Sequence, residues 1–199
     1  MKNIIFVSVS LLLSLSSSSQ TYNCKYDYNF KDDLTQEIRA SLSNKIVNKD
    51  QDIVIQFERK DSSIVMTFHC ISGKYSLRLY NSTNKEPLFL VFNNDSIEKL
   101  YPNSSMVYSK ANSGLTFSGV RNIEFAPAYN MTNEILLKLQ RNMIKKIRIT
   151  AKGTEGMRQN PIENIEYEIE QSKALLIPPM IDCILNVDIT HQKLLSKKK

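Results

Sequence analysis

The chain lacks tryptophan and holds only two histidines and five glycines among its 199 residues. With two histidines and three cysteines, the clustered ligand sets of zinc sites are excluded. The one glycine-rich stretch, KGTEG, has neither the spacing nor the strand-to-helix setting of a phosphate-binding loop. The missing tryptophan also disfavours a sugar-stacking surface. These absences predict that the chain has no metal site and no cofactor site.

The scarcity of histidine also limits catalysis by an activated nucleophile, which needs a base held against that nucleophile. His191 falls in the basic C-terminal stretch, and His69 lies beside Cys70 in the expected strand SSIVMTFHCI. Adjacent strand residues point to opposite faces, so His69 and Cys70 cannot form a catalytic pair. We expect a structural or solvent-facing role for His69 and predict no catalytic residue.

Only one hydrophobic run stands out, at the N-terminus, from about Ile4 to Leu15 after the positive Lys2. It is shorter than the roughly 18 to 20 apolar residues that cross a bilayer, and small residues follow it. This is the pattern of a secretory signal peptide at residues 1–19. It predicts a secreted or periplasmic protein without a transmembrane segment, in which residues 20–190 form a single domain.

The excess of positive charge is concentrated at the two ends of the chain. The formal net charge is +6, but Lys2 and four lysines in residues 191–199 supply five of these charges. The body carries too little net charge for a nucleic-acid surface, so we predict no nucleic-acid partner. Residues 191–199 are expected to form a disordered basic tail. One alternative function is an envelope-surface protein held on anionic lipid or polymer by this tail.

Three cysteines, Cys24, Cys70 and Cys183, would enter the oxidising compartment that the leader predicts. One disulfide with one thiol left over fits this number, and the spacing does not determine the pairing. Cys70 and Cys183 also align with apolar neighbours, so both could instead be buried thiols.

An alternating pattern at the start of the expected domain predicts a strand. Cys24, Tyr26, Tyr28 and Phe30 alternate with polar residues, which is the period of a half-buried strand. We interpret this aromatic row as a core face. The next stretch, 33–46, fits the spacing of a helix and of a strand, so its structure stays open.

Short strands separated by polar turns dominate the middle of the chain. The predicted strands are Ile53–Glu58, Ser63–Ile71, Tyr75–Tyr80, Pro87–Phe92, Leu115–Ser118 and Asn122–Phe125. Short connections favour antiparallel pairing. We interpret as a turn, rather than as a calcium loop, the oxygen-rich group Asn93, Asn94, Asp95 and Glu98.

Helical spacing occurs twice near the C-terminus. Thr132 is a suitable N-cap for a helix of about ten residues. Residues 173–187 have a second helical pattern, which Pro178 and Pro179 should split or kink. The predicted fold class is α+β and mainly β, with antiparallel sheets, a short helix before the last two strands and a kinked C-terminal helix.

Two strands near the C-terminus carry opposite charges. KKIRIT places Lys146 and Arg148 on one face and Lys145 on the opposite side, and NIEYEIEQ places three acids, Glu166, Glu168 and Glu170, on one face. If these strands pair antiparallel across a loop of about a dozen residues, the charges form a cross-strand ladder above a shared apolar face. The alternative is a glycoside-type hydrolase using Glu166 and Glu168, whose expected spacing of about 6.6 Å lies at the lower edge of the inverting range. We favour the ladder because it explains both strands.

Two short elements and their order resemble a group of bacterial proteins. Asp33-Leu34-Thr35 lies near the start of the expected domain, and Lys146-Ile147-Arg148-Ile149 precedes a last strand and a C-terminal helix. This arrangement resembles small uncharacterised secreted proteins of Bacteroidota-type bacteria, from which the chain departs by a longer loop at Gly153–Pro161. The resemblance implies a mainly β domain with a strand at 33–46, and it brings no catalytic residues.

An export signal without any catalytic set favours a non-enzymatic binding module of the periplasm or the extracellular space. Its partner is expected to be a protein or another component of the envelope or the extracellular medium.

Overall fold

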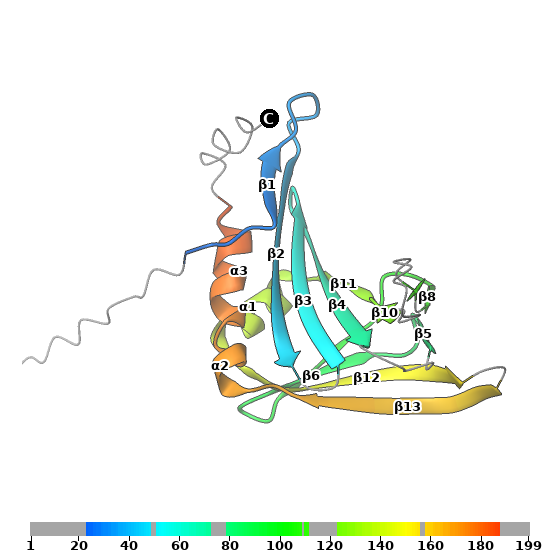
Figure 1. Ribbon diagram of the computed structural model, residues 1–199. Coiled ribbons are helices and arrows are strands. Elements are labelled where there is room, and N and C mark those ends of the chain that lie inside the picture. The colour runs from blue at the N-terminus through cyan, green and yellow to red at the C-terminus, as the bar shows by residue number, and fades with distance from the viewer. Residues whose placement is uncertain are drawn as a thin grey trace, which may run out of the picture.

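The computed structural model describes residues 23–48, 51–72, 79–108, 110–111, 123–155 and 158–187. They form two antiparallel sheets that meet at an angle, with the helices along one side of the first sheet (Figure 1). The expected signal peptide, the basic tail with His191 and the strand expected at Leu115–Ser118 lie outside the described residues. So does most of the strand expected at Tyr75–Tyr80.

Sheet A is formed by the strands that follow the expected leader. Among the described residues its strand order is β1-β2-β3-β4-β10-β9, and β11 pairs with the same edge of β4 as β10 does. Alternate residues along β3 and β4 are buried, as expected for strands with one face on the core. The strands are β1 (Tyr28–Lys31), β2 (Ile38–Asn48), β3 (Gln51–Lys60), β4 (Ser63–Ser72), β9 (Lys110–Ala111), β10 (Ile123–Phe125) and β11 (Ala128–Met131).

Sheet B is organised around one long strand, β12. One edge of β12 pairs with β6 and then β5, and its other edge pairs with β13. β7 adds to the outer edge of β6, and β8 adds to β5. The strands are β5 (Leu79–Thr83), β6 (Leu88–Phe92), β7 (Ile97–Leu100), β8 (Met106–Tyr108), β12 (Ile144–Glu155) and β13 (Arg158–Glu168).

The mainly β, antiparallel fold class is confirmed, but the sequence did not predict every strand. β7, β8, β9 and β11 have no counterpart among the predicted strands. None of them exceeds four residues, which is too short for a periodic pattern to stand out.

The core lies between the inner faces of the two sheets and the helices. Residues of sheet A, sheet B and the C-terminal helices belong to one buried cluster. Tyr167 of β13 reaches across to sheet A, where its ring centroid lies 6.2 Å from that of Phe68. Its hydroxyl is 3.3 Å from the Cys70 sulfur. The largest fully buried side chains are Phe57, Phe68, Phe92, Phe125 and Tyr129.

The N-terminal strand is shorter than predicted, and its aromatic row does not form one core face. β1 begins at Tyr28 rather than Cys24, after a bend at Asp27. Cys24 and Tyr26 pack against the core, whereas Tyr28 and Phe30 contact each other, with ring centroids 5.9 Å apart, outside the buried cluster. The bend interrupts the two-residue period, so the core-face prediction was wrong for Tyr28 and Phe30.

The stretch left open between helix and strand is a turn followed by a strand. β2 starts at Ile38, as the resemblance implied for this part of the chain. Leu34, which completes the helical spacing, is 95% exposed, whereas Ala40 and Leu42 are buried. Pairing with β1 on one edge and β3 on the other satisfies the β2 backbone, and this non-local pairing overrides the helical spacing.

The loop predicted at Gly153–Pro161 is mostly strand, so that prediction was wrong. β12 and β13 leave only two residues between them. Gly153 is accommodated where the register shifts between Lys152 and Thr154, as at a β-bulge. Pro161 lies in β13, which pairs with β12 alone among the described strands, and edge strands tolerate proline. The glycine at a bulge and the proline on an edge strand therefore occupy positions where these residue types destabilise a sheet least.

Both predicted helical regions are confirmed. α1 (Asn133–Arg141) is preceded by Thr132, whose side chain accepts a hydrogen bond from the Ile135 backbone N–H. The C-terminal region is divided into α2 (Gln171–Ala174) and α3 (Ile177–Leu185). Pro178 and Pro179 lie in the first turn of α3, where the missing N–H groups have no helical partner to lose.

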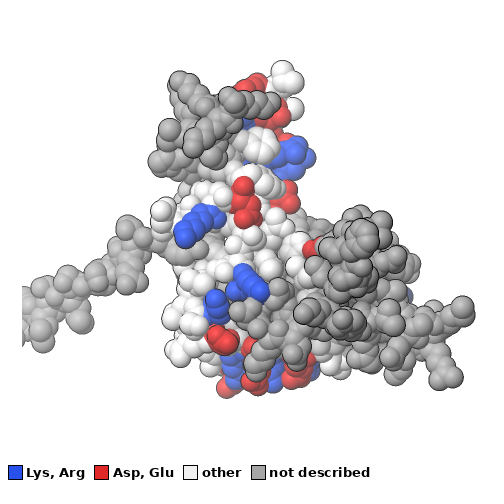
Figure 2. Space-filling model, in the orientation of Figure 1, with Lys and Arg blue, Asp and Glu red and all other residues white. Residues whose placement is uncertain are grey.

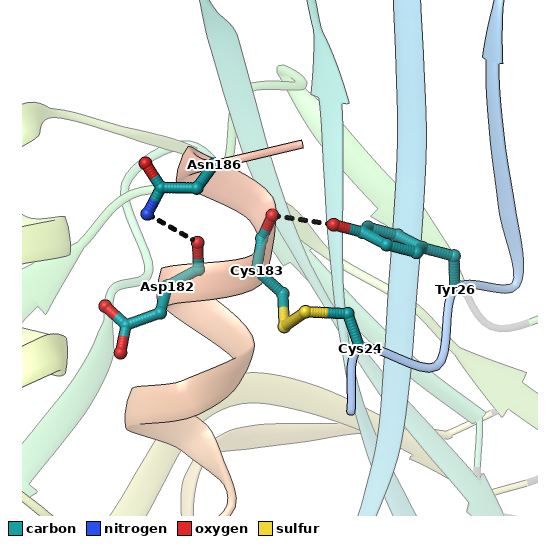
Figure 3. Close-up of a disulfide and its surroundings, with 5 residues drawn as sticks. All are labelled: Cys24, Tyr26, Asp182, Cys183 and Asn186. Carbon is teal, nitrogen blue, oxygen red and sulfur yellow. Dashed lines mark hydrogen bonds between the residues drawn. A yellow bond between two sulfur atoms is a disulfide. The ribbon is translucent and has the colours of Figure 1, made fainter. Parts of the chain in front are cut away.

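Three side chains from the N-terminal half of the chain hold the C-terminal end of α3, and Figure 3 shows two of them, Cys24 and Tyr26. Cys24 forms a disulfide with Cys183, and the Tyr26 hydroxyl donates a hydrogen bond of 2.9 Å to the Cys183 carbonyl. The Arg59 guanidinium donates to the Leu185 carbonyl at 2.6 Å. The last carbonyls of a helix lack helical partners and carry partial negative charge, so a cation and a hydroxyl stabilise them.

The cysteine pairing was not readable from the sequence. One disulfide and one remaining thiol are present, as expected, and the pair is Cys24 with Cys183. Cys70 is free and buried. The alternative of two buried thiols therefore holds for Cys70 and is wrong for Cys183.

Replacing Cys24 and Cys183 together by alanine should lower the free energy of unfolding by about 3–5 kcal/mol, because their bridge joins residues 159 positions apart. Urea denaturation of the wild type and the double variant measures this difference. Cys70→Ala is the control, since it keeps the bridge and should still lose stability when a reductant is added. Equal unfolding midpoints for the double variant and the oxidised wild type would contradict the prediction.

Candidate functional site: the outer face of sheet B

The outer face of sheet B carries the residues that alternate with the buried residues of its strands. Leu88 and Leu90 of β6 and Ile147 and Ile149 of β12 are buried, so the residues between them point outward. The strand register aligns these outward residues in two rows. One row is Lys99, Phe89, Arg148 and Glu166. The next row is Ile97, Val91, Lys146 and Glu168.

Glu166 binds two cations, as the charge ladder predicts. Its Oε2 accepts a hydrogen bond of 3.0 Å from Lys146 Nζ, and its Oε1 lies 2.5 Å from Arg148 Nη2. Hydrogen bonds from Lys146 and Arg148 hold the pKa of Glu166 below its usual value. Glu168 lies opposite Lys146 in the register. The ladder is therefore confirmed, on a face where the Glu166 side chain is 38% exposed and water screens each pair.

Lys145, which falls outside the ladder, is the extra residue of a β-bulge. The register of β12 against β6 shifts between Ile144 and Lys146. This shift lets both Ile144 and Ile147 reach the core although they are three residues apart. The Lys145 ammonium forms an ion pair with Asp95 in the turn between β6 and β7.

The oxygen-rich group at residues 93–98 is a hairpin turn, as predicted. Asp95 adopts a φ of 62°, and Asn94 Oδ1 accepts a hydrogen bond of 2.6 Å from Ser96 Oγ. The Glu98 carboxylate accepts a hydrogen bond of 2.7 Å from Lys138 of α1. Protein donors thus contact side-chain oxygens of Asn94, Asp95 and Glu98, three of the four residues that the calcium interpretation would have required as ligands.

Phe89 is the centre of an apolar and cationic strip on this face. Lys99 Nζ lies 5.6 Å and Arg148 Cζ lies 5.8 Å from the centroid of its ring. Cations at this distance are attracted by the negative face of an aromatic ring. Val91 is half-buried beside it, and Ile97 is 59% exposed. We call these five residues the basic–apolar face: Phe89, Val91, Ile97, Lys99 and Arg148.

The two signs of charge meet at the end of the molecule that sheet B forms. Basic and acidic side chains lie next to each other along the base of the space-filling view (Figure 2). In the sheet, the acids Glu166 and Glu168 belong to β13, whereas β6 and β7 contribute Phe89, Ile97 and Lys99. The side of the face toward β7 is therefore basic and apolar, and the side toward β13 is neutralised.

His69 lies on the opposite sheet, in a chain of hydrogen bonds. Its Nδ1 is 2.5 Å from Glu124 Oε1, and its Nε2 is 2.9 Å from Gln56 Oε1. Gln56 donates in turn to the hydroxyl of Ser41, which is fully buried, at 2.8 Å. Gln56 separates His69 from Ser41, so the hydroxyl cannot give its proton directly to the ring. These contacts support the structural role expected for His69.

Cys70 points to the opposite face of β4 from His69, as predicted. Its sulfur contacts the Tyr167 hydroxyl in the core. Burial raises the pKa of the Cys70 thiol, which keeps it in the protonated, weakly nucleophilic form. The geometry thus separates the two side chains that a Cys–His pair would need together.

No protein-family model, curated protein or solved structure matches this chain significantly. No three His, Cys, Asp or Glu side chains in the described residues come together as metal ligands could. Within the same residues, no helix has the length and apolar character needed to cross a membrane. The resemblance to Bacteroidota-type proteins stays a prediction.

The basic–apolar face was not predicted from the sequence. Phe89 and Val91 fall in a predicted strand without an expected role, and β7, which carries Ile97 and Lys99, has no counterpart among the predicted strands. Alternation within LFLVF separates its two faces, but it does not say which strand lies beside it. Only the register of β7 against β6 brings Lys99 onto the ring of Phe89.

Glu166→Gln should lower stability at neutral pH, because it removes the carboxylate that Lys146 and Arg148 share. The pKa of Glu166 is lowered in the folded protein, so its contribution is complete above the unfolded-state value of about 4.3. The contribution is lost as pH falls through the lower folded value. Urea denaturation should therefore separate wild type and variant at pH 7 and bring them together in acid.

Glu170→Gln is the matched control for this prediction. Glu170 is exposed, and its side chain makes no capping hydrogen bond to α2. Its substitution should lower stability at pH 7 by less than Glu166→Gln does, because only a charge at the start of α2 is lost. A Glu166→Gln difference that stays constant down to acid pH would refute the role assigned to the ladder.

Proposed function

We propose that this protein is an exported, non-enzymatic binding module that presents the basic–apolar face to a partner carrying acidic and apolar side chains. The observation that carries this proposal is the exposed Ile97 next to Phe89, with Lys99 and Arg148 over the same ring. Aromatic and arginine side chains surrounded by apolar neighbours are the usual anchors of protein interfaces. Positive charge at such a surface favours an acidic partner.

The rigidity of this face supports binding. Phe89 and Arg148 come from the middle of paired strands, and Glu166 holds Arg148 in one position by an ion pair. Side chains held in place before binding lose less conformational entropy when a partner arrives. A sheet surface therefore offers these anchors at a lower entropic cost than a loop would.

Two features support export. Residues 1–19 have the charge, apolar run and small residues of a signal peptide. The Cys24–Cys183 disulfide is typical of proteins in an oxidising compartment. A periplasmic or extracellular location is therefore part of the proposal.

Two alternatives stay predictions. A glycoside-type hydrolase using Glu166 and Glu168 would lose its activity with Glu166→Gln, although here Glu166 binds Lys146 and Arg148 on an exposed face. An envelope-surface protein held by the lysine tail would change location when residues 193–199 are deleted.

The proposal predicts that Ile97→Asn combined with Lys99→Glu abolishes capture of a specific partner from the envelope fraction of the source cell. A photo-crosslinking residue at position 97 should couple to that partner, and added salt should weaken the capture because the contact is partly ionic. Quantitative mass spectrometry of the captured material measures both effects.

Leu137→Asn is the control, because Leu137 is a 43% exposed leucine on α1 that does not belong to the basic–apolar face. This variant should capture the partner as the wild type does, and a crosslinker at position 137 should not couple to it. Capture that is equal for the wild type and the face variant would refute the docking surface.

A further inference from the structure

The turn between β1 and β2 carries an exposed leucine at one end of the molecule. Leu34 is 95% exposed, more than any other large hydrophobic side chain in the described residues. The turn lies at the top of Figure 1, and sheet B lies at the base. A single exposed leucine is ordinary on a protein surface, so its support and its neighbours decide whether it can anchor a contact.

Hydrogen bonds hold this turn in a defined conformation. Asp32 Oδ1 accepts bonds from the backbone N–H groups of Leu34 at 2.9 Å and Thr35 at 2.8 Å. The Asp32 carbonyl accepts a bond of 2.8 Å from the N–H of Gln36, which has a φ of 61°. Positive φ is unfavourable for glutamine, so these contacts must compensate for it. Leu34 is therefore presented on an ordered support.

The base of the turn is fixed as well. Glu37 forms ion pairs with Arg39 at 2.6 Å and with Lys60 of β3 at 3.0 Å. The N–H of Ile38 donates a bond of 2.9 Å to the carboxylate of Asp61, in the neighbouring β3–β4 turn. The β1–β2 turn is thus bonded to the neighbouring β3–β4 turn, and both turns support the segment that carries Leu34.

Two carboxylates lie beside Leu34. Asp32 precedes it by two residues and Asp33 by one, and Figure 2 shows acidic side chains with basic ones beside them at this end of the molecule. Bonds from the backbone N–H groups of Thr35 and Leu34 hold the pKa of Asp32 below its usual value, so it stays negatively charged at neutral pH. We call Asp32, Asp33 and Leu34 the acidic tip.

The acidic tip and the basic–apolar face are complementary in both charge and hydrophobicity. The tip offers one apolar side chain with two carboxylates next to it. The face offers exposed Ile97 and half-buried Phe89, with Lys99 and Arg148 beside them. Oppositely charged surfaces that also share an apolar centre are the pattern of a specific contact.

We propose that the acidic tip of one copy docks on the basic–apolar face of a second copy, with Leu34 placed beside Phe89 and Ile97. This inference rests on the proposed function, since it names a partner for the same face. The two contacting surfaces differ and lie at opposite ends of the molecule, so the contact is heterologous and propagates as open, head-to-tail assemblies. The contact is small, so assembly requires high protein concentration and weakens as salt is added.

Sedimentation velocity of the oxidised chain over a range of protein and salt concentrations tests this proposal. Leu34→Asn and Ile97→Asn should each weaken self-association by about tenfold or more, because each removes one half of the apolar contact. A mixture of these two variants should form dimers and nothing longer, since only one intact tip and one intact face remain in each pair.

A charge exchange tests the ionic half of the contact. Asp33→Lys alone and Lys99→Glu alone should weaken self-association, and the double variant should recover it. Leu137→Asn is the matched control and should assemble as the wild type does. Thermal unfolding of each variant shows whether the fold is retained, and Asp33 and Leu34 are exposed positions where substitution leaves the core intact.

Three results would overturn the inference: a wild type that stays monomeric up to about 1 mM, assembly that survives both asparagine variants, or a mixture that grows beyond dimers. If the wild type is monomeric but envelope capture is lost with the face variant and kept with Leu34→Asn, the proposed function stands and self-docking is refuted. If assembly depends on both surfaces while no envelope partner is captured, self-docking stands and the envelope partner is refuted.

Discussion

The two-residue alternation of β12 determines what sheet B buries and what it presents. Ile147, Ile149 and Ala151 are almost fully buried, so Lys146 and Arg148 must point outward. A slip of one residue in register would place these cations in the core, at a cost no nearby acid could offset. The bulge at Lys145 restores the phase at the start of the strand and brings Ile144 inward as well. Pairing on both edges then fixes β13 and β6 relative to this strand.

α3 closes the other half of the core. It is held at its last turn, where backbone carbonyl groups lack helical hydrogen-bond partners. Cys24, Tyr26 and Arg59 all act on the last turn of this helix. They connect the first described residues to the last helix, so the two ends of the domain stabilise one another. Because α3 contributes five buried residues to the core and packs on β2 and β3, loosening its end would expose apolar surface of sheet A.

The basic–apolar face and the acidic tip share a physical design, in which exposed apolar groups are supported by rigid surroundings. Phe89 is held within a sheet and has Lys99 and Arg148 over its ring. Leu34 is held by a turn whose bonds converge on Asp32. Both surfaces keep apolar atoms in water although the core contains the same residue types. The unfavourable free energy of this exposure is recovered where a partner removes those atoms from water.

Predictions from the sequence succeeded where the deciding interactions are local. Thr132 caps α1 through a contact three residues away, and Pro178 with Pro179 sets the start of α3 within one turn. The charge ladder was predictable because opposite charges alternate with apolar residues on two nearby segments. Predictions failed at Gly153–Pro161, where turn-type residues are tolerated by a bulge and an edge strand, and at Tyr28 and Phe30, where a bend interrupts the alternation.

The sequence by itself determined the mainly β class, the start of α1, the break before α3 and the faces of β12 and β13, because hydrophobic period, capping and proline act within a few residues. Only the tertiary structure decided that Cys24 pairs with Cys183, that β7 lies beside β6, and that the acidic tip and the basic–apolar face stand at opposite ends. These outcomes depend on contacts between residues far apart in the chain. The register that selects such contacts is set by the packing of the whole core rather than by any local pattern.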